Sequence, residues 1–264
     1  MEAFLLAAGL GTRLRPLTEN LPKPLIDVAG KPLIEWNLQL LSMIGISRVV
    51  INTHYLHDKL NKYIRDNKNK WNLEIIISHE PELLDTGGGL KQALTKLQSD
   101  NIIIWNSDII LDPVFIGGLS GSNSESEFSR FLKLSNDTDK QASVTILTRN
   151  TSQKEMEQFG SLGLSADGRV VEFLGIKYGK EDIFERVIFL GISIIKREIS
   201  HFFPKNTKVF SSTRDIYPQI LQKYADKKSG GIWATKLTSY WNDVGTIERL
   251  EDASKYMREI SRLA

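Results

Sequence analysis

The chain has 264 residues, and its 34 basic and 32 acidic side chains leave a net charge of only +2, which argues against nucleic acid as the main partner. Hydrophobic residues make up 41% and charged residues 25%, as in globular proteins, and the absence of cysteine excludes disulfides, thiolate metal sites and a cysteine nucleophile. No apolar run approaches the ~18 residues of a membrane span, and the first apolar stretch begins within three residues of Met1. We therefore expect a cytoplasmic protein with no signal peptide and no membrane partner.

The first predicted element is a buried strand over residues 3–8, which breaks into a glycine loop. Gly9 and Gly11 allow a tight turn whose N–H groups can face anionic oxygens. The glycines alone fit an ordinary turn equally well, but two arginines follow them and Lys23 stands between two prolines, which favours a triphosphate site. Neither the dinucleotide fingerprint nor the P-loop signature is present. The expected nucleotide-binding residues of this region are Ala7, Ala8, Gly9, Gly11, Thr12, Arg13 and Lys23.

These same residues carry a resemblance to a known family. The stretches 6–18, 21–25 and 30–35 are similar to the signature of the sugar-1-phosphate nucleotidylyltransferases, also called NDP-sugar pyrophosphorylases, and the match is long and ungapped. The resemblance implies that the chain binds an NTP and a sugar 1-phosphate. It also implies catalytic roles for Arg13 and Lys23, with Lys23 on the α-phosphate and the incoming phosphate.

Short strands and helices then alternate. Apolar residues recur at helical spacing from Leu33 to Ile44, and a strand at 48–52, a polar helix at 55–70 and a strand at 73–78 follow. Such an order indicates βαβ units with right-handed crossovers. We therefore predict an α/β fold, a Rossmann-like three-layer α/β/α architecture with a mostly parallel mixed sheet, whose ligands bind beyond the carboxyl ends of the strands. The resemblance implies the same nucleotide-diphospho-sugar transferase fold.

Three glycines, Gly87 to Gly89, open the next predicted helix, which covers residues 90–97. By themselves they indicate only a flexible helix start. In the family that the chain resembles, the equivalent loop holds the nucleotide base. The resemblance therefore assigns Gly87 and Gly88 to the base.

A further buried strand at 101–105 ends in Asn106-Ser107-Asp108. A carboxylate at this position faces the crevice of the sheet, where it can hold Mg²⁺ against phosphate oxygens. Turn aspartates are common after strands, but this segment resembles the metal-binding motif of the family. We therefore expect Asp108 to be a catalytic metal ligand and Asn106 to contact the sugar.

Residues 117–140 form the one compositional break, rich in Gly, Ser and Asn, and we expect a mobile surface insertion with a short helix near 128–134. A strand at 142–148 returns to the sheet. The motifs before and after the break belong to one site, so a single nucleotidyltransferase domain over 1–264 is predicted.

The dipeptide Asp167-Gly168 predicts a β-hairpin between strands that end near 164 and begin near 169. The resemblance places Gly160 and Glu172 of this hairpin against the sugar. Many family members have Glu-Lys-Pro here, with the lysine on the sugar phosphate, whereas this chain has Glu-Phe-Leu. The departure leaves Lys177 or Arg169 as candidates for the phosphate, although each fits a plain surface charge better.

The last third of the chain contains a long buried strand at 187–195 with a central Gly191, which indicates close approach of a ligand or of another backbone, and we expect it at the sugar. The stretch 241–246 precedes an amphipathic terminal helix and could be an ordinary turn capped by Thr246. It resembles the second metal-binding segment of the family. The resemblance therefore implies that Asp243 shares one Mg²⁺ with Asp108.

The function that we expect is transfer of a nucleotidyl group from an NTP to a sugar 1-phosphate, with release of pyrophosphate, for cell-wall or surface-polysaccharide precursors. The pair UTP and N-acetylmuramate 1-phosphate is slightly favoured over GTP with mannose or heptose 1-phosphate. Two other classes stay open: a regulatory paralogue that only binds a nucleotide sugar, and a glycosyltransferase with a similar nucleotide-binding half. Whether the protein is a monomer or a homo-oligomer is left open.

Overall fold

The computed structural model describes residues 1–117 and 125–263, and no helix in these ranges is long and apolar enough to cross a membrane. The strands are β1 (Glu2–Leu6), β2 (Asp27–Val28), β3 (Lys31–Pro32), β4 (Arg48–Thr53), β5 (Glu74–His79), β6 (Asn101–Asn106), β7 (Ile109–Leu111), β8 (Val144–Arg149), β9 (Ser161–Leu164), β10 (Val170–Phe173), β11 (Ile176–Lys177), β12 (Glu185–Lys196), β13 (Ile232–Lys236) and β14 (Trp241–Asp243). The α-helices are α1 (Leu33–Met43), α2 (His57–Asn67), α3 (Asp85–Leu94), α4 (Val114–Gly117), α5 (Glu127–Ser135), α6 (Gln153–Phe159), α7 (Tyr217–Tyr224) and α8 (Ile247–Leu263).

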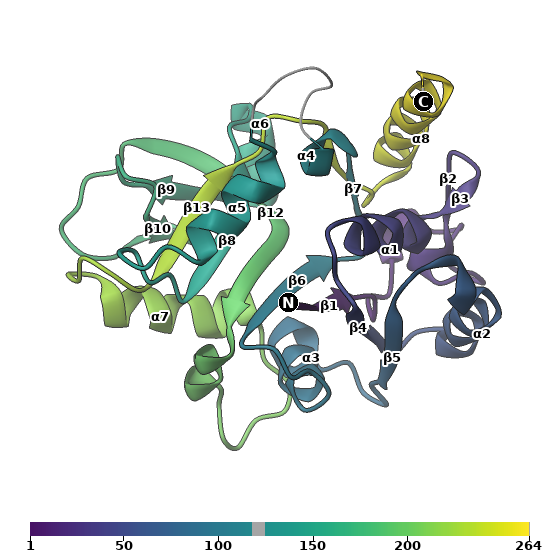
Figure 1. Cartoon of the computed structure of the whole chain (residues 1–264), viewed down its shortest axis with the longest axis horizontal. Coiled ribbons are helices and arrows are strands. Elements are labelled where there is room, and N and C mark those ends of the chain that lie inside the picture. Colours follow the sequence, from purple (N-terminus) through teal and green to yellow (C-terminus); the bar gives the residue numbers. More distant parts are fainter. Residues whose placement is uncertain (118–124, 264) are drawn as a thin grey trace.

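One mixed sheet forms the centre of the molecule (Figure 1). Its first half, in the order β6-β1-β4-β5, is entirely parallel, as the predicted βαβ units require. The second half is antiparallel around β12, which pairs with β6, β8 and β9, while β13 runs parallel to β8. The predicted Rossmann-like α/β fold is therefore confirmed.

Strand β12 belongs to both halves of the sheet. Its segment Glu185–Ile188 pairs with β9, and its segment Ile192–Lys196 pairs with β6. Between them Gly191 has a φ of +77°, and the register with β8 shifts between Phe189 and Ser193. Figure 1 shows β12 running between β8–β10 and β6. Strand β12 thus changes its pairing partner at a bulge, and this bulge lies beside the carboxyl end of β6.

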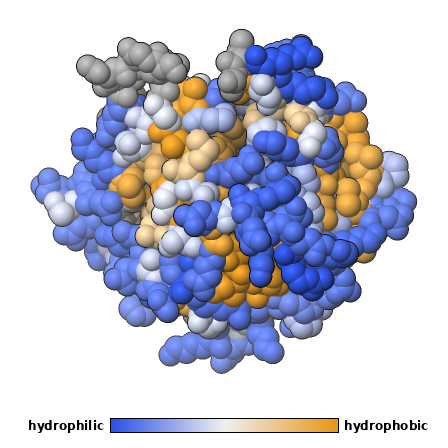
Figure 2. All heavy atoms as spheres, turned by 45° about the vertical axis from the view of Figure 1, so that its right-hand side comes forward, coloured by the Kyte–Doolittle hydropathy of each residue, from blue (hydrophilic) through white to orange (hydrophobic). Residues whose placement is uncertain are grey.

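Apolar side chains bury both faces of the sheet. Neighbouring residues of β1 show the alternation: Leu5 packs in a cluster with residues of α1, α2 and α5, whereas Phe4 packs in a cluster with residues of α3 and α7. Outside this core the surface is mostly hydrophilic, with hydrophobic residues in local patches, as Figure 2 shows for one face.

Two predicted segments differ from the structure. The short helix expected near 128–134 is present as α5, but it buries Phe128 and Phe131 in the core, so this part of the expected surface insertion is packed structure. Residues 118–124 lie outside the described residues. Helix α3 begins at Asp85, so the three glycines lie inside its first turns and not ahead of it.

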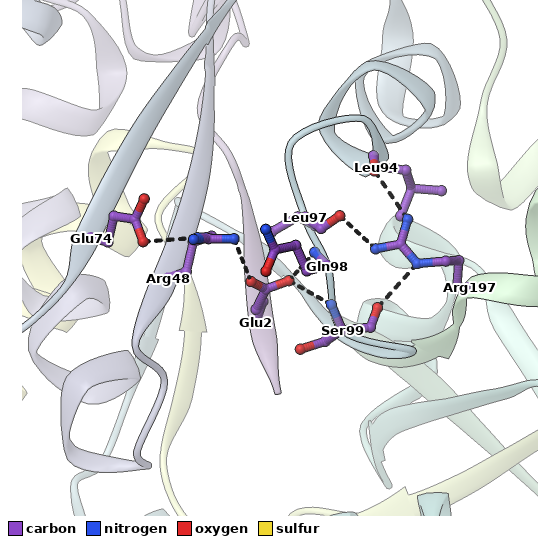
Figure 3. Close-up of polar contacts among 8 residues, drawn as sticks. All are labelled: Glu2, Arg48, Glu74, Leu94, Leu97, Gln98, Ser99 and Arg197. Atoms are coloured by element: carbon purple, nitrogen blue, oxygen red, sulfur yellow. Dashed lines mark hydrogen bonds and ion pairs between the residues drawn. The ribbon is translucent and has the colours of Figure 1, made fainter.

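A polar network joins the amino ends of the parallel strands (Figure 3). Glu2 accepts hydrogen bonds from the backbone N–H groups of Gln98 and Ser99, and Arg48 donates to Glu2 over 3.1 Å and to Glu74 over 2.9 Å. Arg197 donates to backbone carbonyl oxygens around the end of α3, those of Leu94, Leu97 and Ser99. The network ties β1, β4 and β5 to the turn before β6.

Candidate active site

A cleft of about 530 Å³ opens at the carboxyl ends of β1, β4 and β6. Most of the predicted nucleotide-binding residues line it: Ala7, Ala8, Gly9, Gly11, Thr12, Arg13 and Lys23. Asn106 and Asp108 line it from the end of β6. The structure therefore brings the predicted phosphate loop, residues 7–13, and Asp108, the first predicted metal ligand, into one cavity.

The predicted phosphate loop has its shape because of one glycine. Gly11 has a φ of +63°, and a Cβ there would lie 2.9 Å from Thr18 Cγ2 and 3.1 Å from Lys23 Cβ. The Thr18 hydroxyl donates to the Gly11 carbonyl over 2.8 Å. Only glycine allows this close approach, which sets Lys23 beside the loop.

Lys23 and Asp108 form an ion pair inside the cleft, with 2.5 Å between Nζ and Oδ2. The loop that carries Asp108 is fixed by a hydrogen bond from Asn37, a fully buried residue of α1. The Asn37 amide donates to the Ser107 carbonyl over 3.0 Å, and its oxygen accepts from the Trp105 indole over 2.6 Å. Asp108 is thus placed by a buried hydrogen-bonded residue that local sequence patterns do not identify.

Asp243 reaches the same place from the other end of the chain. Strand β14 pairs antiparallel with β7, so that Asp243 lies opposite Ile109, and the Val244 N–H donates to the Asp108 carbonyl over 2.9 Å. Burial, and then the neighbouring Asp108 carboxylate, raise the pKa of Asp243, against the opposing effect of nearby cations such as Lys23. Two carboxylates therefore share one partly buried space.

Arg13 lies beside this pair. A Cβ on Gly245 would be 2.7 Å from Arg13 Nη2 and 2.9 Å from Asp243 Oδ1, so Gly245 leaves the space in which guanidinium and carboxylate meet. Arg249 of α8 donates a hydrogen bond to the Asp243 carbonyl oxygen over 3.4 Å.

The two aspartates fit a divalent metal ion. Asp108 Oδ1 and Asp243 Oδ1 are buried and have no hydrogen-bond partner among residues 1–117 and 125–263. Hard oxygen ligands suit Mg²⁺, which usually takes only one or two carboxylates and fills its shell with water and substrate phosphates. No group of three or more acidic, His or Cys side chains able to hold a metal occurs in the described ranges, which agrees with such a sparse site.

The two glycines that were predicted to contact the base, Gly87 and Gly88, have a structural explanation. The N–H groups of Gly87 and Gly88 both donate to the Phe210 carbonyl, over 2.9 and 3.0 Å. A Cβ on Gly87 would lie 2.4 Å from the Phe210 ring, and one on Gly88 would lie 2.2 Å from the Lys208 carbonyl oxygen. Neither glycine is among the cleft-lining residues, whereas Asp85 and Thr86 are. Their contact with a base stays a prediction.

The predicted sugar residues fall into two groups. Gly191 packs against the cleft-lining Asn106, since a Cβ on it would lie 2.7 Å from Asn106 Nδ2, but Gly191 is not itself among the lining residues. Gly160 and Glu172 lie on the β9–β10 hairpin and are not among the residues lining the cleft. Arg186 forms a paired ion contact with Glu172, one branch at 2.9 Å, and this contact lowers the pKa of Glu172 against the effect of burial.

The two candidates for the sugar phosphate are engaged elsewhere. Arg169 is buried and donates to the backbone carbonyls of Tyr224 and Lys227. Lys177 is half-exposed and lies 3.7 Å from Asp182. Arg169 therefore holds a turn of the structure and is not a surface charge as expected.

Two further cleft residues were not predicted. Asn52, at the end of β4, and Glu80, just after β5, are both buried and both line the cleft. The only local signal is that each polar residue stands at the carboxyl end of a strand, close to the position that Asp108 occupies after β6.

Comparison with known proteins agrees with this geometry. Residues 2–260 match the family model described as nucleotidyl transferase. The chain is 28% identical over 250 residues to the mannose-1-phosphate guanylyltransferase catalytic subunit beta of Xenopus tropicalis, covering 93% of the chain and 61% of that protein. It is 40% identical over 125 residues to the N-acetylmuramate alpha-1-phosphate uridylyltransferase of Neisseria meningitidis, covering 47% of the chain and 54% of that protein.

The fold is shared with solved structures. HddC from Yersinia pseudotuberculosis superposes with a TM-score of 0.71 at 24% identity, over 97% of the chain and 99% of HddC.

The chain belongs to the nucleotidyl transferase family. Enzymes of this family generally use a divalent metal ion. The chain spans 61% of the length of the Xenopus relative.

Proposed function

We propose that this protein transfers a nucleotidyl group from an NTP to a sugar 1-phosphate and releases pyrophosphate. The observation that carries the proposal is the convergence of Arg13, Lys23, Asp108 and Asp243 on one glycine-walled cleft in a chain of this family. An oxygen of the sugar phosphate would attack the α-phosphorus in line, and the bond from the α-phosphorus to the bridging oxygen of the β-phosphate would break. The attacking oxygen is already anionic at neutral pH, so no general base is needed.

The residues of the cleft have the charges that this reaction requires. Lys23 would leave Asp108 for the α-phosphate and the incoming phosphate, and Arg13 would balance the charge that grows on the leaving pyrophosphate. Asp108 and Asp243 would hold Mg²⁺, which supplies charge neutralisation between the two anions when bound. NTPs are made in the cytoplasm, so we place the protein there.

For the substrates we favour UTP with N-acetylmuramate 1-phosphate. The support is the 40% identity with the Neisseria uridylyltransferase over nearly half of the chain. GTP with mannose or heptose 1-phosphate is the second candidate, because the guanylyltransferase relatives match 93% of the chain.

The test is pyrophosphate release with Mg²⁺ across five NTPs, each with N-acetylmuramate, mannose, heptose and glucose 1-phosphates. Arg13→Ala, Lys23→Ala, Asp108→Asn and Asp243→Asn should each lower turnover by about 10²-fold or more. Arg258→Ala is the matched control, because Arg258 is an exposed residue of α8 and is not a cleft-lining residue. Release with no substrate pair while nucleotide still binds would favour a regulatory paralogue.

A further inference from the structure

Two buried polar side chains connect opposite walls of the cleft. The Ala7 N–H, at the start of the phosphate loop, donates to Asn52 Oδ1 over 2.7 Å. Asn52 Nδ2 donates to Glu80 Oε1 over 2.8 Å, and Glu80 Oε2 accepts from the Leu84 N–H over 3.1 Å. The chain of bonds Ala7–Asn52–Glu80–Leu84 therefore runs from the phosphate loop to the segment before α3.

Burial makes this arrangement costly to disturb. Glu80 is 0% exposed and Asn52 2%, and Glu80 forms no ion pair with any described residue. Gly89 of α3 lies directly over them, since a Cβ there would be 2.7 Å from Glu80 Oε1 and 3.0 Å from Asn52 Nδ2. A buried carboxylate that is held only by amide N–H groups is unusual, and its neighbours must present their donors in a fixed order.

We propose that Asn52 and Glu80 are positioning residues that lock the phosphate loop to the segment 80–84, so that the two ends of a bound nucleotide meet walls of fixed separation. The inference rests on the proposed function for its effect on turnover. Each end of this chain of bonds lies next to a cleft-lining segment. Ala7 comes shortly before Gly9 and Gly11 on one wall, and Leu84 comes directly before Asp85 and Thr86 on the other.

The direction of the bonds offers a sharp test. Glu80→Gln keeps the shape but leaves one acceptor oxygen for two donors, and Asn52→Asp sets two carboxylates against each other. In the double variant Asn52→Asp with Glu80→Gln, the carboxylate at position 52 accepts from Ala7 and from the amide at position 80, whose oxygen accepts from Leu84. Both the charge and the order of donors and acceptors are restored.

Each single variant should lower kcat/KM for the NTP on the order of 10²-fold at a temperature where it remains folded, and the double variant should recover most of this loss. Amide hydrogen exchange at Ala7 and Leu84 should quicken in the single variants and slow again in the double variant. Thr53→Val is the matched control: Thr53 is the next residue of β4, is fully buried, and its hydroxyl has no hydrogen-bond partner among the described residues, so its removal should change neither readout.

The outcomes separate this inference from the proposed reaction. If the unmodified protein binds Mg–NTP without turnover, the proposed reaction is wrong. The positioning role is then tested by the nucleotide Kd of the single and double variants in place of kcat/KM. If no nucleotide binds, the exchange series alone decides it. A double variant no better than the worse single variant, in turnover and in exchange, overturns the positioning role and indicates that Glu80 contacts the ligand directly.

Discussion

Arg13 is an exposed residue whose position depends on a neighbour without a side chain. Its guanidinium lies 2.7 Å from the position that a Cβ of Gly245 would take, and the Asp243 carboxylate lies 2.9 Å from the same position. Gly245 has ordinary backbone angles, unlike Gly11 and Gly191, so the requirement at this position is space and not conformation.

Gly245→Ala should therefore keep the fold and lower turnover, on the order of 10²-fold, because Arg13 and Asp243 must move apart. The measurement is pyrophosphate release beside the midpoint of thermal unfolding. A variant with unchanged turnover would show that Arg13 does not act from this position. A large drop in the midpoint would show instead that Gly245 is needed for folding.

Gly191 has both a left-handed backbone conformation and a close steric contact. Gly30 has the left-handed conformation without the contact, so a comparison of the two positions separates the two effects. Both have positive φ, +77° and +87°, but a Cβ on Gly30 would meet nothing within 4 Å, whereas one on Gly191 would meet Asn106. We expect Gly30→Ala to cost about 1–2 kcal/mol of unfolding free energy and to keep turnover. Gly191→Ala should cost more and should also lower turnover.

Urea unfolding and pyrophosphate release on both variants check this pair. Equal losses of stability with equal turnover would mean that the contact with Asn106 has no consequence.

Sequence reasoning at the residue scale found the residues whose partners are implied by a motif. The structure brings Lys23, Asp108 and Asp243 together in or beside the cleft, and their chemical roles stay predictions. Asn37, Asn52 and Glu80 were missed because each acts through residues far along the chain, as when Asn37 bonds the Ser107 carbonyl. Gly87 and Gly88 are also determined by distant residues: the backbone and side chain of the segment around Phe210 leave no space for a Cβ at either position. No local sequence pattern predicts this contact.

At the scale of elements, α5 shows how a polar stretch can contain a core helix. Phe128 and Phe131 share its buried side, and its Glu127 accepts hydrogen bonds from the backbone N–H groups of Thr238 and Ser239, ahead of β14. Helix α5 therefore anchors the segment that leads to Asp243.

Phe131→Ala should lower the free energy of unfolding by about 3–5 kcal/mol, because Phe131 is fully buried. Phe184→Ala removes the same side chain where it is 72% exposed and should change stability by less than about 0.5 kcal/mol. Urea unfolding compares them. Similar values for both would contradict the packing of α5 in the core.

The elements were predictable where their signals are local. Asp167-Gly168 gave the antiparallel β9–β10 hairpin, and Thr246 caps α8 through the Arg249 N–H, as expected. The bulge of β12 was not predictable beyond its glycine, because it arises from pairing with β9 and β6 at once. The early start of α3 depends on the bonds from Gly87 and Gly88 to Phe210.

For the whole molecule, the two ends of the parallel strands have different tasks. The cleft occupies the carboxyl ends, and the network of Glu2 and Arg48 occupies the amino ends (Figure 3). Burial alone would raise the pKa of Glu2, but the N–H groups of Ser99 and Gln98 and the charge of Arg48 outweigh it and lower this pKa. An acid with a lowered pKa in the folded state stabilises the protein above its unfolded-state value, about 4.3, and this contribution is lost as the pH falls through the folded-state value.

Glu2→Gln should therefore cost about 1–3 kcal/mol at neutral pH and should flatten the fall in stability on acidification, with turnover at neutral pH unchanged. Thermal unfolding at several pH values from neutral to below the ordinary glutamate pKa tests this. An acid transition as steep as that of the unmodified protein would assign the pH dependence to other carboxylates.

The pairing of β14 with β7 has a consequence for how the protein is made. A ribosome delivers the glycine loop, Lys23 and Asp108 first, and Asp243 only 135 residues after Asp108. Until β14 docks, the nascent chain holds one of the two aspartates, so it lacks the paired carboxylates. Under the proposed function, a product that ends before β14 would therefore not consume nucleotide, even if its other strands had folded.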